Sequence, residues 1–135
     1  DIRESEFIFI FEKTFRDESV SELIDLSWDN EAITINDEVK ETVEGVYSHL
    51  EEIDAVISKY STKRSIARIP KINLSALRLA VYEINYKSDK APIRVVINEA
   101  VGLVKKYAQE QDVSFVNGVL GSYSRSLEAE SKSKD

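Results

Sequence analysis

Cysteine is absent from this chain of 135 residues, and His49 is its only histidine. Without cysteine there is no disulfide framework, no thiolate nucleophile and no cysteine-ligated zinc. A single histidine leaves little from which to build a metal site or a Ser-His-Asp triad. We therefore expect no catalytic residues, no metal and no cofactor, which argues against an ordinary hydrolase.

Turn-forming residues and long apolar runs are also scarce. The chain has four glycines and two prolines, while 42% of its residues are hydrophobic and 32% are charged. This composition indicates one globular domain with long regular elements. The longest apolar run, Phe7 to Phe11, is far shorter than the roughly 20 residues that cross a bilayer. We expect a soluble, cytoplasmic protein that has no contact with membranes.

The net charge of −7 is unevenly distributed along the chain. Residues 1–60 contain 5 Lys and Arg against 17 Asp and Glu, whereas residues 61–135 contain 13 against 8. The most basic stretch, residues 63–106, has ten basic and three acidic residues. An acidic protein with such a stretch can still present one basic face to a polyanion. The alternative is a charged surface that only contacts solvent.

Helical periodicity is clearest between Val39 and Tyr60. Apolar residues recur there at intervals of three and four, at Val39, Val43, Val46, Leu50, Ile53, Ile57 and Tyr60. This spacing predicts one long helix with a single apolar face, and Asn36 is a suitable N-cap.

The C-terminal half shows three more helical patterns. One covers 74–86 with Asn73 as its cap, one begins after Pro92 and continues to about 109, and one is capped by Asp112 and reaches about 128. Residues 129–135 are mostly serine, lysine and acid, so we expect a disordered tail there.

The N-terminal segment supports two interpretations. Its run from Phe7 to Phe11 consists of strong β-formers. However, its flanks are charged, no second strand is available for pairing, and a broad helical face fits Ile2, Phe7, Ile8, Phe11 and Phe15. We predict a helix, followed by a short one that Asp17 or Ser19 caps and that turns Ile24 and Trp28 inward. The fold class is all-α, a bundle of about six or seven helices.

The glycines do not form a phosphate-binding loop or a dinucleotide fingerprint. All four, Gly45, Gly102, Gly118 and Gly121, fall in or near helical patterns. Since glycine is unfavourable inside helices, we expect these residues to allow close helix packing. We interpret His49 as an ordinary surface histidine.

Three strings carry a resemblance to a known family. They are ALRLAVYEI at 76–84, PIRVVINEAV at 92–101 and FVNGVL at 115–120. In this order and spacing they resemble the NusB family of transcription antitermination factors, most closely over residues 68–123. Arg3 and Glu4, followed by an apolar helix that ends at Phe11, look like the opening of that family.

The resemblance implies a NusB-like fold of two small helical subdomains, at 1–62 and 63–128, and no catalysis. It also implies that the protein binds boxA RNA with the ribosomal protein NusE, within the RNA polymerase antitermination complex that supports ribosomal RNA transcription. The implied RNA-binding residues are Arg3, Lys105, Lys106, Phe115 and Asn117. The implied partner-binding residues are Phe11 and Asn73. Because some members pair with themselves, a homodimer stays open.

Other interpretations remain open at the level of residues and of the whole protein. Phe115 is either a core aromatic or a platform on which a base stacks. Asn117 either reads RNA or bonds to its helical neighbours. The chain itself could be a protein-protein interaction module of the same fold that has lost RNA binding. It could also be the NusB-like domain that precedes RNA cytosine methyltransferases in longer proteins.

Overall fold

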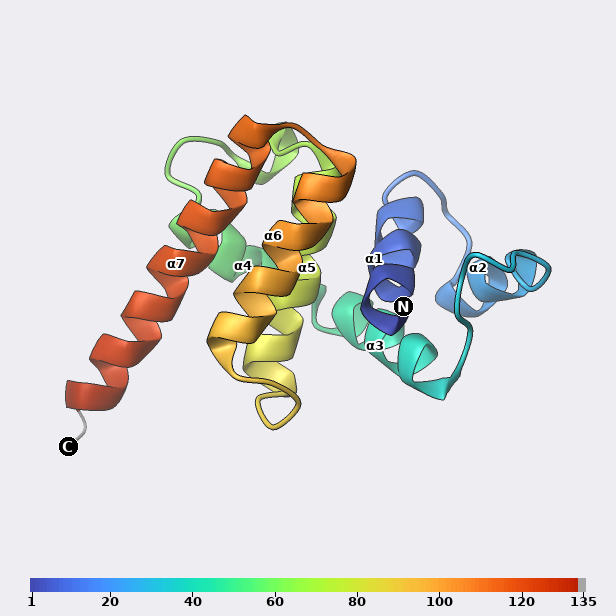
Figure 1. Ribbon diagram of the computed structural model, residues 1–135, viewed down its shortest axis with the longest axis horizontal. Coiled ribbons are helices and arrows are strands. Elements are labelled where there is room, and N and C mark those ends of the chain that lie inside the picture. The colour runs from blue at the N-terminus through green and yellow to red at the C-terminus, as the bar shows by residue number, and fades with distance from the viewer. Residues whose placement is uncertain (134–135) are drawn as a thin grey trace.

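The computed structural model describes residues 1–133, and over that range it contains helices and no strands. Seven α-helices and one 3₁₀ turn follow in order: α1 (Ile2–Lys13), α2 (Val20–Leu26), α3 (Asp37–Ser48), α4 (Leu50–Tyr60), η1 (Ile66–Arg68), α5 (Lys71–Tyr86), α6 (Ile93–Tyr107) and α7 (Glu110–Ser133). Figure 1 shows α1 between α2 and the pair formed by α5 and α6, with α3 across its lower end in this view. The predicted all-α fold and helix number are confirmed.

The run of β-formers from Phe7 to Phe11 lies in α1, as predicted. The side chain of Asp1 accepts a hydrogen bond from the backbone N–H of Glu4 and so caps this helix. Its buried face differs from the predicted one, because Phe9 and Ile10 are fully buried whereas Phe15 is 63% exposed. Phe9 and Ile10 are covered because α1 packs against α2, α3 and α5 together, and Phe15 is exposed because the helix ends at Lys13, before it.

The second helix begins with a complete capping box formed by Ser19 and Glu22, which confirms Ser19 as a cap. Ile24 is buried as predicted, but Trp28 is 73% exposed, so the prediction that it turns inward is wrong. The helix ends at Leu26. Trp28 therefore lies in the following turn and no longer shares the helical face of Ile24.

The long helix predicted between Val39 and Tyr60 is instead two helices. Asn36 caps α3 as predicted, accepting a hydrogen bond from the N–H of Val39 at 2.8 Å. The helix is interrupted at His49, whose φ of −112° and ψ of 20° are not helical. The interruption lets α3 pack on α1 while α4 packs on α5 and α7. His49 is half-buried and its ring lies 4.1 Å from that of Tyr86, so it is not an ordinary surface residue.

Close helix packing through a glycine occurs where α3 crosses α5. A Cβ on Gly45 would lie 2.6 Å from ring carbons of Tyr82, so only glycine fits there. For Gly102 and Gly118 the packing interpretation is wrong, because nothing lies within 4 Å of a Cβ at either position.

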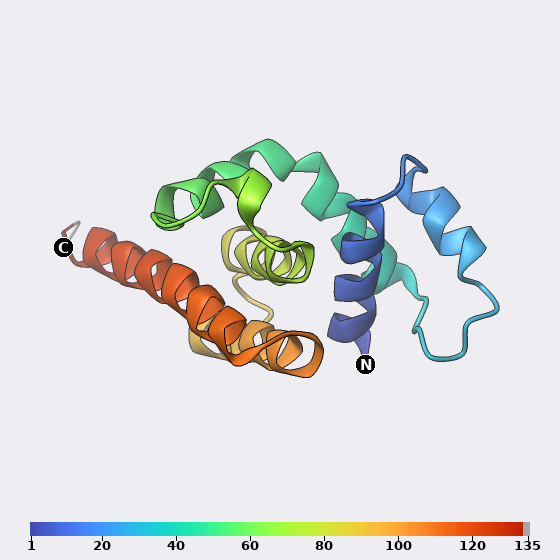
Figure 2. The same ribbon diagram turned by 90° about the horizontal axis from the view of Figure 1, so that it is seen from above.

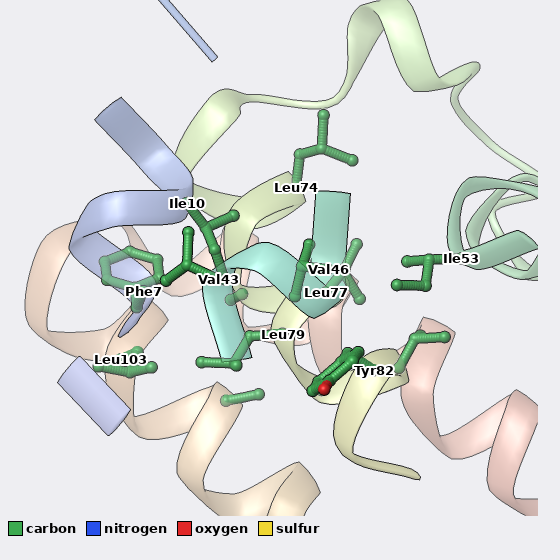
Figure 3. Close-up of a cluster of buried hydrophobic side chains, with 14 of the residues drawn as sticks. Phe7, Ile10, Val43, Val46, Ile53, Leu74, Leu77, Leu79, Tyr82 and Leu103 are labelled. Atoms are coloured by element: carbon green, nitrogen blue, oxygen red, sulfur yellow. The ribbon is translucent and has the colours of Figure 1, made fainter. Parts of the chain in front are cut away.

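Helix α5 is the centre of the bundle. Every residue from Asn73 to Ile84 is buried, as expected for a helix that other elements surround. Figure 2 shows α5 between α4 on one side and α6 and α7 on the other. Leu74, Leu77, Leu79 and Tyr82 of this helix join the apolar cluster shown in Figure 3.

Two predicted caps are placed differently. The N-cap of α5 is Pro70, and Asn73 lies inside the first turn, where its side chain bonds to Asp112 of α7. Helix α7 begins at Glu110, so Asp112 also lies inside its first turn, where its carboxylate accepts the N–H of Gln109 at 3.1 Å. Both side chains are therefore used to join α5 to α7.

The C-terminal segment is helical for longer than expected. Helix α7 continues to Ser133, so the predicted disordered tail is wrong for residues 129–133, and residues 134–135 lie outside the described part. The division into subdomains at residue 62 stays a prediction. Within residues 1–133, no helix combines the length and the apolar character needed to cross a membrane.

Candidate nucleic-acid interface

A surface hollow of about 370 Å³ lies where the first turns of α7 meet the end of α4. We call it the Phe115 hollow. It is lined by Tyr60, Ser61, Thr62, Lys63, Arg64, Gln111, Ser114, Phe115, Gly118, Val119 and Ser122. Phe115 is half-buried, so its ring contributes both to the core and to the wall of the hollow. The two interpretations of Phe115 therefore do not exclude each other.

Cationic groups surround the aromatic ring in this hollow. The guanidinium carbon of Arg64 lies 4.9 Å from the centroid of the Phe115 ring, a cation–π contact. Lys63 lines the same hollow and is exposed. Gly118 leaves the wall open, because it carries no side chain. An aromatic face beside basic groups is the combination that holds a base and its phosphate in single-stranded nucleic acid.

The back of the hollow is held in place by Tyr60. Its hydroxyl donates to Ser126 Oγ at 2.7 Å, and its ring lies 5.4 Å from that of Tyr123. These contacts tie the end of α4 to α7. The two elements that line the hollow are thus fixed relative to each other.

A second hollow of about 410 Å³ lies on the other side of the first turn of α7. We call it the Asn73 hollow. It is lined by Phe11, Phe15, Pro70, Lys71, Ile72, Asn73, Tyr107, Ala108, Gln109 and Asp112. Phe11 and Phe15 form an edge-to-face pair with ring centroids 5.1 Å apart. The structure therefore brings together the two predicted partner-binding residues, Phe11 and Asn73.

Asn73 is fully buried and is oriented by α7. Its Nδ2 donates to Asp112 Oδ1 at 2.9 Å, while its Oδ1 has no hydrogen-bond donor among the described residues. An unpaired buried acceptor costs about 1–3 kcal/mol, which a donor group would recover. The surface of the Asn73 hollow is therefore aromatic, and the unsatisfied acceptor of Asn73 is buried beneath it.

Two of the predicted RNA-binding cations are engaged within the protein. Arg3 forms a bidentate ion pair with Glu83, at 2.6 and 2.9 Å, and its Nη1 lies 3.9 Å from Glu99. Lys106 Nζ donates to Glu4 at 2.6 Å, and Tyr107 donates to the same carboxylate. These hydrogen bonds lower the pKa of Glu4 below its usual value. Neither cation is therefore freely available to a phosphate.

The other predicted RNA-binding residues are exposed but scattered. Lys105 and Asn117 are exposed, and neither lines the Phe115 hollow or the Asn73 hollow. Of the five predicted residues, only Phe115 lines one of these two hollows.

Sequence reasoning did not identify Arg64 as the neighbour of Phe115. The two residues are 51 positions apart, so no helical or strand spacing could connect them. One feature of the sequence did point to the region of Arg64: residues 55–82 contain no aspartate or glutamate. In the described part of the chain, no group of three or more His, Cys, Asp or Glu side chains could hold a metal.

Comparison with known proteins decides the family. The sequence model of the NusB family matches residues 1–125. The chain belongs to the NusB family. It is 42% identical over 116 residues to the transcription antitermination protein NusB of Ruminiclostridium cellulolyticum, which covers 84% of this chain and 77% of that protein. It is 39% identical to the protein of the same name from Clostridium acetobutylicum, over 93% of this chain and 94% of that one.

Solved structures of the NusB family share the fold. A chain in the crystal structure of the antitermination factors NusB and NusE in complex with double-stranded RNA superposes with a TM-score of 0.78. It is 35% identical in sequence, over 90% of this chain and 91% of that chain. That NusB-family assembly therefore contains both an RNA and a protein partner.

Proposed function

We propose that this protein is a transcription antitermination factor that binds boxA-type single-stranded RNA together with ribosomal protein NusE. In this role it supports ribosomal RNA transcription as part of the RNA polymerase antitermination complex in the cytoplasm. Family membership supports the proposal, as does the similar NusB chain in a complex with NusE and RNA.

The observation that carries the proposal is the position of the two hollows on α7. Gln111, Ser114 and Phe115 line the Phe115 hollow, whereas Gln109 and Asp112 line the Asn73 hollow. The same short segment therefore separates an aromatic, basic surface from a second aromatic surface. RNA in one hollow and a protein in the other would lie side by side and could contact each other.

The residues have unequal roles in this proposal. Phe115 offers a ring for base stacking, and Phe11 contacts the partner. Asn73 is fully buried, so it acts on the partner surface only indirectly, by holding Asp112 in the wall of the Asn73 hollow. Lys105 is exposed and has no acidic group within 4.0 Å in the described part of the chain, so it is available to a phosphate. Arg3 and Lys106 bind RNA only if they exchange the carboxylates of Glu83 and Glu4 for a phosphate.

The charge of the chain explains why a partner is needed. A protein with net charge −7 gains little from the release of counterions by RNA. A basic ribosomal protein bound to the acidic N-terminal half would reduce this repulsion. We therefore expect weak RNA binding by the protein alone and stronger binding with NusE.

The test is fluorescence anisotropy with a labelled boxA-like RNA, at low and moderate salt, with and without the cognate NusE. We expect an affinity that rises at least about tenfold with NusE and falls as salt increases. RNA affinity that is the same with and without NusE would contradict the proposed cooperation. Binding of NusE without any RNA binding would instead support a protein-protein interaction module that has lost RNA binding.

A further inference from the structure

The segment from the end of α4 to the first residue of α5, residues 61–71, connects the two hollows. Its beginning lines the Phe115 hollow with Lys63 and Arg64, and its end lines the Asn73 hollow with Pro70 and Lys71. Between them lies the 3₁₀ turn η1, which ends at Arg68. Figure 1 shows this segment and the beginning of α7 at the same end of the molecule. We call residues 61–71 the α4–α5 linker.

The α4–α5 linker carries four basic residues and no acidic one. Lys63, Arg68 and Lys71 are exposed, and none has an acidic group of residues 1–133 within 4.0 Å. Arg64 also has no acidic partner, and its guanidinium lies over the Phe115 ring. These cations differ from Arg3 and Lys106, whose charges are neutralised by Glu83 and Glu4.

The sequence on both sides of the α4–α5 linker is also free of acidic residues. The run without acidic residues extends from 55 to 82, well beyond the linker on both sides. Asp112 is the acidic residue that lines the Asn73 hollow, and its Oδ1 accepts from Asn73 and its Oδ2 from the backbone of Gln109. The positive potential of the linker is thus available to a bound polyanion.

We propose that Lys63, Arg68 and Lys71 bind successive phosphates of a single-stranded RNA, so that its backbone follows the α4–α5 linker from the Phe115 hollow toward the Asn73 hollow. This inference rests on the proposed RNA-binding function and names the surface that holds the backbone. Arg64 joins the two kinds of contact, because its guanidinium lies 4.9 Å from the centroid of the Phe115 ring. A base that binds there would either displace this guanidinium from the ring or stack on it. The RNA would then reach the Asn73 hollow, where a protein bound in that hollow could contact the other end of the RNA.

The test compares three triple variants, each studied in the presence of NusE. Lys63→Gln, Arg68→Gln and Lys71→Gln together remove the charges of the linker. A matched control, Lys40→Gln, Arg94→Gln and Lys132→Gln, removes three exposed cations from other parts of the protein. A third variant, Lys63→Arg, Arg68→Lys and Lys71→Arg, keeps every charge. Circular dichroism confirms that each variant is folded, which we expect because the substituted side chains are exposed.

The readout is the affinity for labelled RNA as a function of salt. Each phosphate contact to a single strand contributes about 0.7 to the slope of log K against log salt concentration, so loss of three contacts should reduce that slope by about 2. We expect the linker variant to bind at least about tenfold more weakly at moderate salt. The charge-retaining variant should bind RNA with the affinity of the unmodified protein. The control variant should reduce the salt slope by clearly less than the linker variant does.

The outcomes separate this inference from the proposed function. An unchanged slope in the linker variant, with the unmodified protein still binding RNA, would overturn the backbone path and leave the function intact. Equal losses in the linker variant and the control would also overturn it, because they would show a general charge effect. An absence of RNA binding by the unmodified protein with NusE would overturn the proposed function itself.

Discussion

The guanidinium of Arg3 holds the carboxylate of Glu83 through two hydrogen bonds, and the Glu83 side chain is only 1% exposed. Removing one partner leaves the other charge buried without compensation, which costs roughly 3–5 kcal/mol for a buried pair. Because Arg3 is 19% exposed, we expect Arg3→Ala to lower the free energy of unfolding by about 3 kcal/mol in urea titrations.

Two further variants identify the cause of that loss. Arg16→Ala removes the more exposed ion pair between Arg16 and Glu18. It should lower the free energy of unfolding by less than about 1 kcal/mol. Combining Arg3→Ala with Glu83→Leu should recover stability, since no charge is then left unpaired in the interior. A similar loss in Arg3→Ala and Arg16→Ala would show that the Arg3–Glu83 pair is not a structural element.

Gly45→Ala should destabilise the protein by about 1–3 kcal/mol, because the added methyl group would overlap the ring of Tyr82 and separate α3 from α5. Gly102→Ala is the matched control, since it lies in α6 with open space around its Cβ. The free energy of unfolding of Gly102→Ala should increase by up to about 1 kcal/mol, because alanine has a higher helix propensity than glycine. Thermal unfolding of both variants measures the difference, and a stabilised Gly45→Ala would contradict the close approach.

Glu6 makes the stability depend on pH near neutrality. Its side chain is fully buried, neither oxygen has a hydrogen bond, and burial raises its pKa from 4.5 to about 7. The facing charges include Lys90, 3.9 Å away, together with Glu83 and Glu38. The folded state holds the proton of Glu6 more tightly than the unfolded state does. Protonated Glu6 therefore contributes fully to the free energy of unfolding below pH 4.5, and this contribution is lost as pH rises through about 7.

Glu6→Gln isolates this contribution. The unfolding free energy of the variant, minus that of the unmodified protein, should increase between pH 4.5 and pH 8 by up to about 3 kcal/mol. Urea titrations across this range measure the difference. A difference that does not change with pH would show that Glu6 is ionised in the folded protein throughout.

Phe115→Leu tests base stacking separately from core packing. Leucine retains most of the apolar contact but has no aromatic face, and stacking contributes about 1–3 kcal/mol per base. We expect RNA affinity, measured with NusE, to fall at least about fivefold while helical circular dichroism is unchanged. Phe115→Tyr should bind nearly as well as the unmodified protein. Equal RNA binding by all three proteins would assign Phe115 to the core alone.

Phe11→Ala should weaken binding of NusE by about tenfold or more, because aromatic residues in a hollow often dominate an interface. Trp28→Ala is the control, since this exposed aromatic residue does not line the Asn73 hollow. Isothermal titration calorimetry measures both affinities. If Trp28→Ala lowered the affinity and Phe11→Ala did not, the partner surface would lie beside α2.

Local sequence patterns predicted the helices well where the deciding interactions are local. The caps formed by Asn36 and Ser19, and the helix through Phe7 to Phe11, depend on residues within a few positions of each other. The interruption at His49 was missed because the apolar spacing continues across it. Its cause is the need of α3 and α4 to pack against different neighbours, which is a tertiary effect.

The residues that make up the site could be predicted only in part. The strings around Phe115 and Pro92 allowed the family to be identified, and Phe11 and Asn73 do lie in one hollow. The pairing of Arg3 with Glu83 and of Lys106 with Glu4 was not visible, because the partners are 80 and 102 positions apart. A charged residue is available to a ligand only if folding leaves it without an internal partner.

The all-α fold, the acidic N-terminal half and the basic middle stretch follow from the amino-acid sequence, and three of its strings identify the NusB family. Helical periodicity and local caps predict the helices because they act over a few residues. The three-dimensional packing sets which cations pair with carboxylates, and it places Arg64 over Phe115. Those outcomes depend on distances between segments far apart in the chain, and packing around α5 sets these distances.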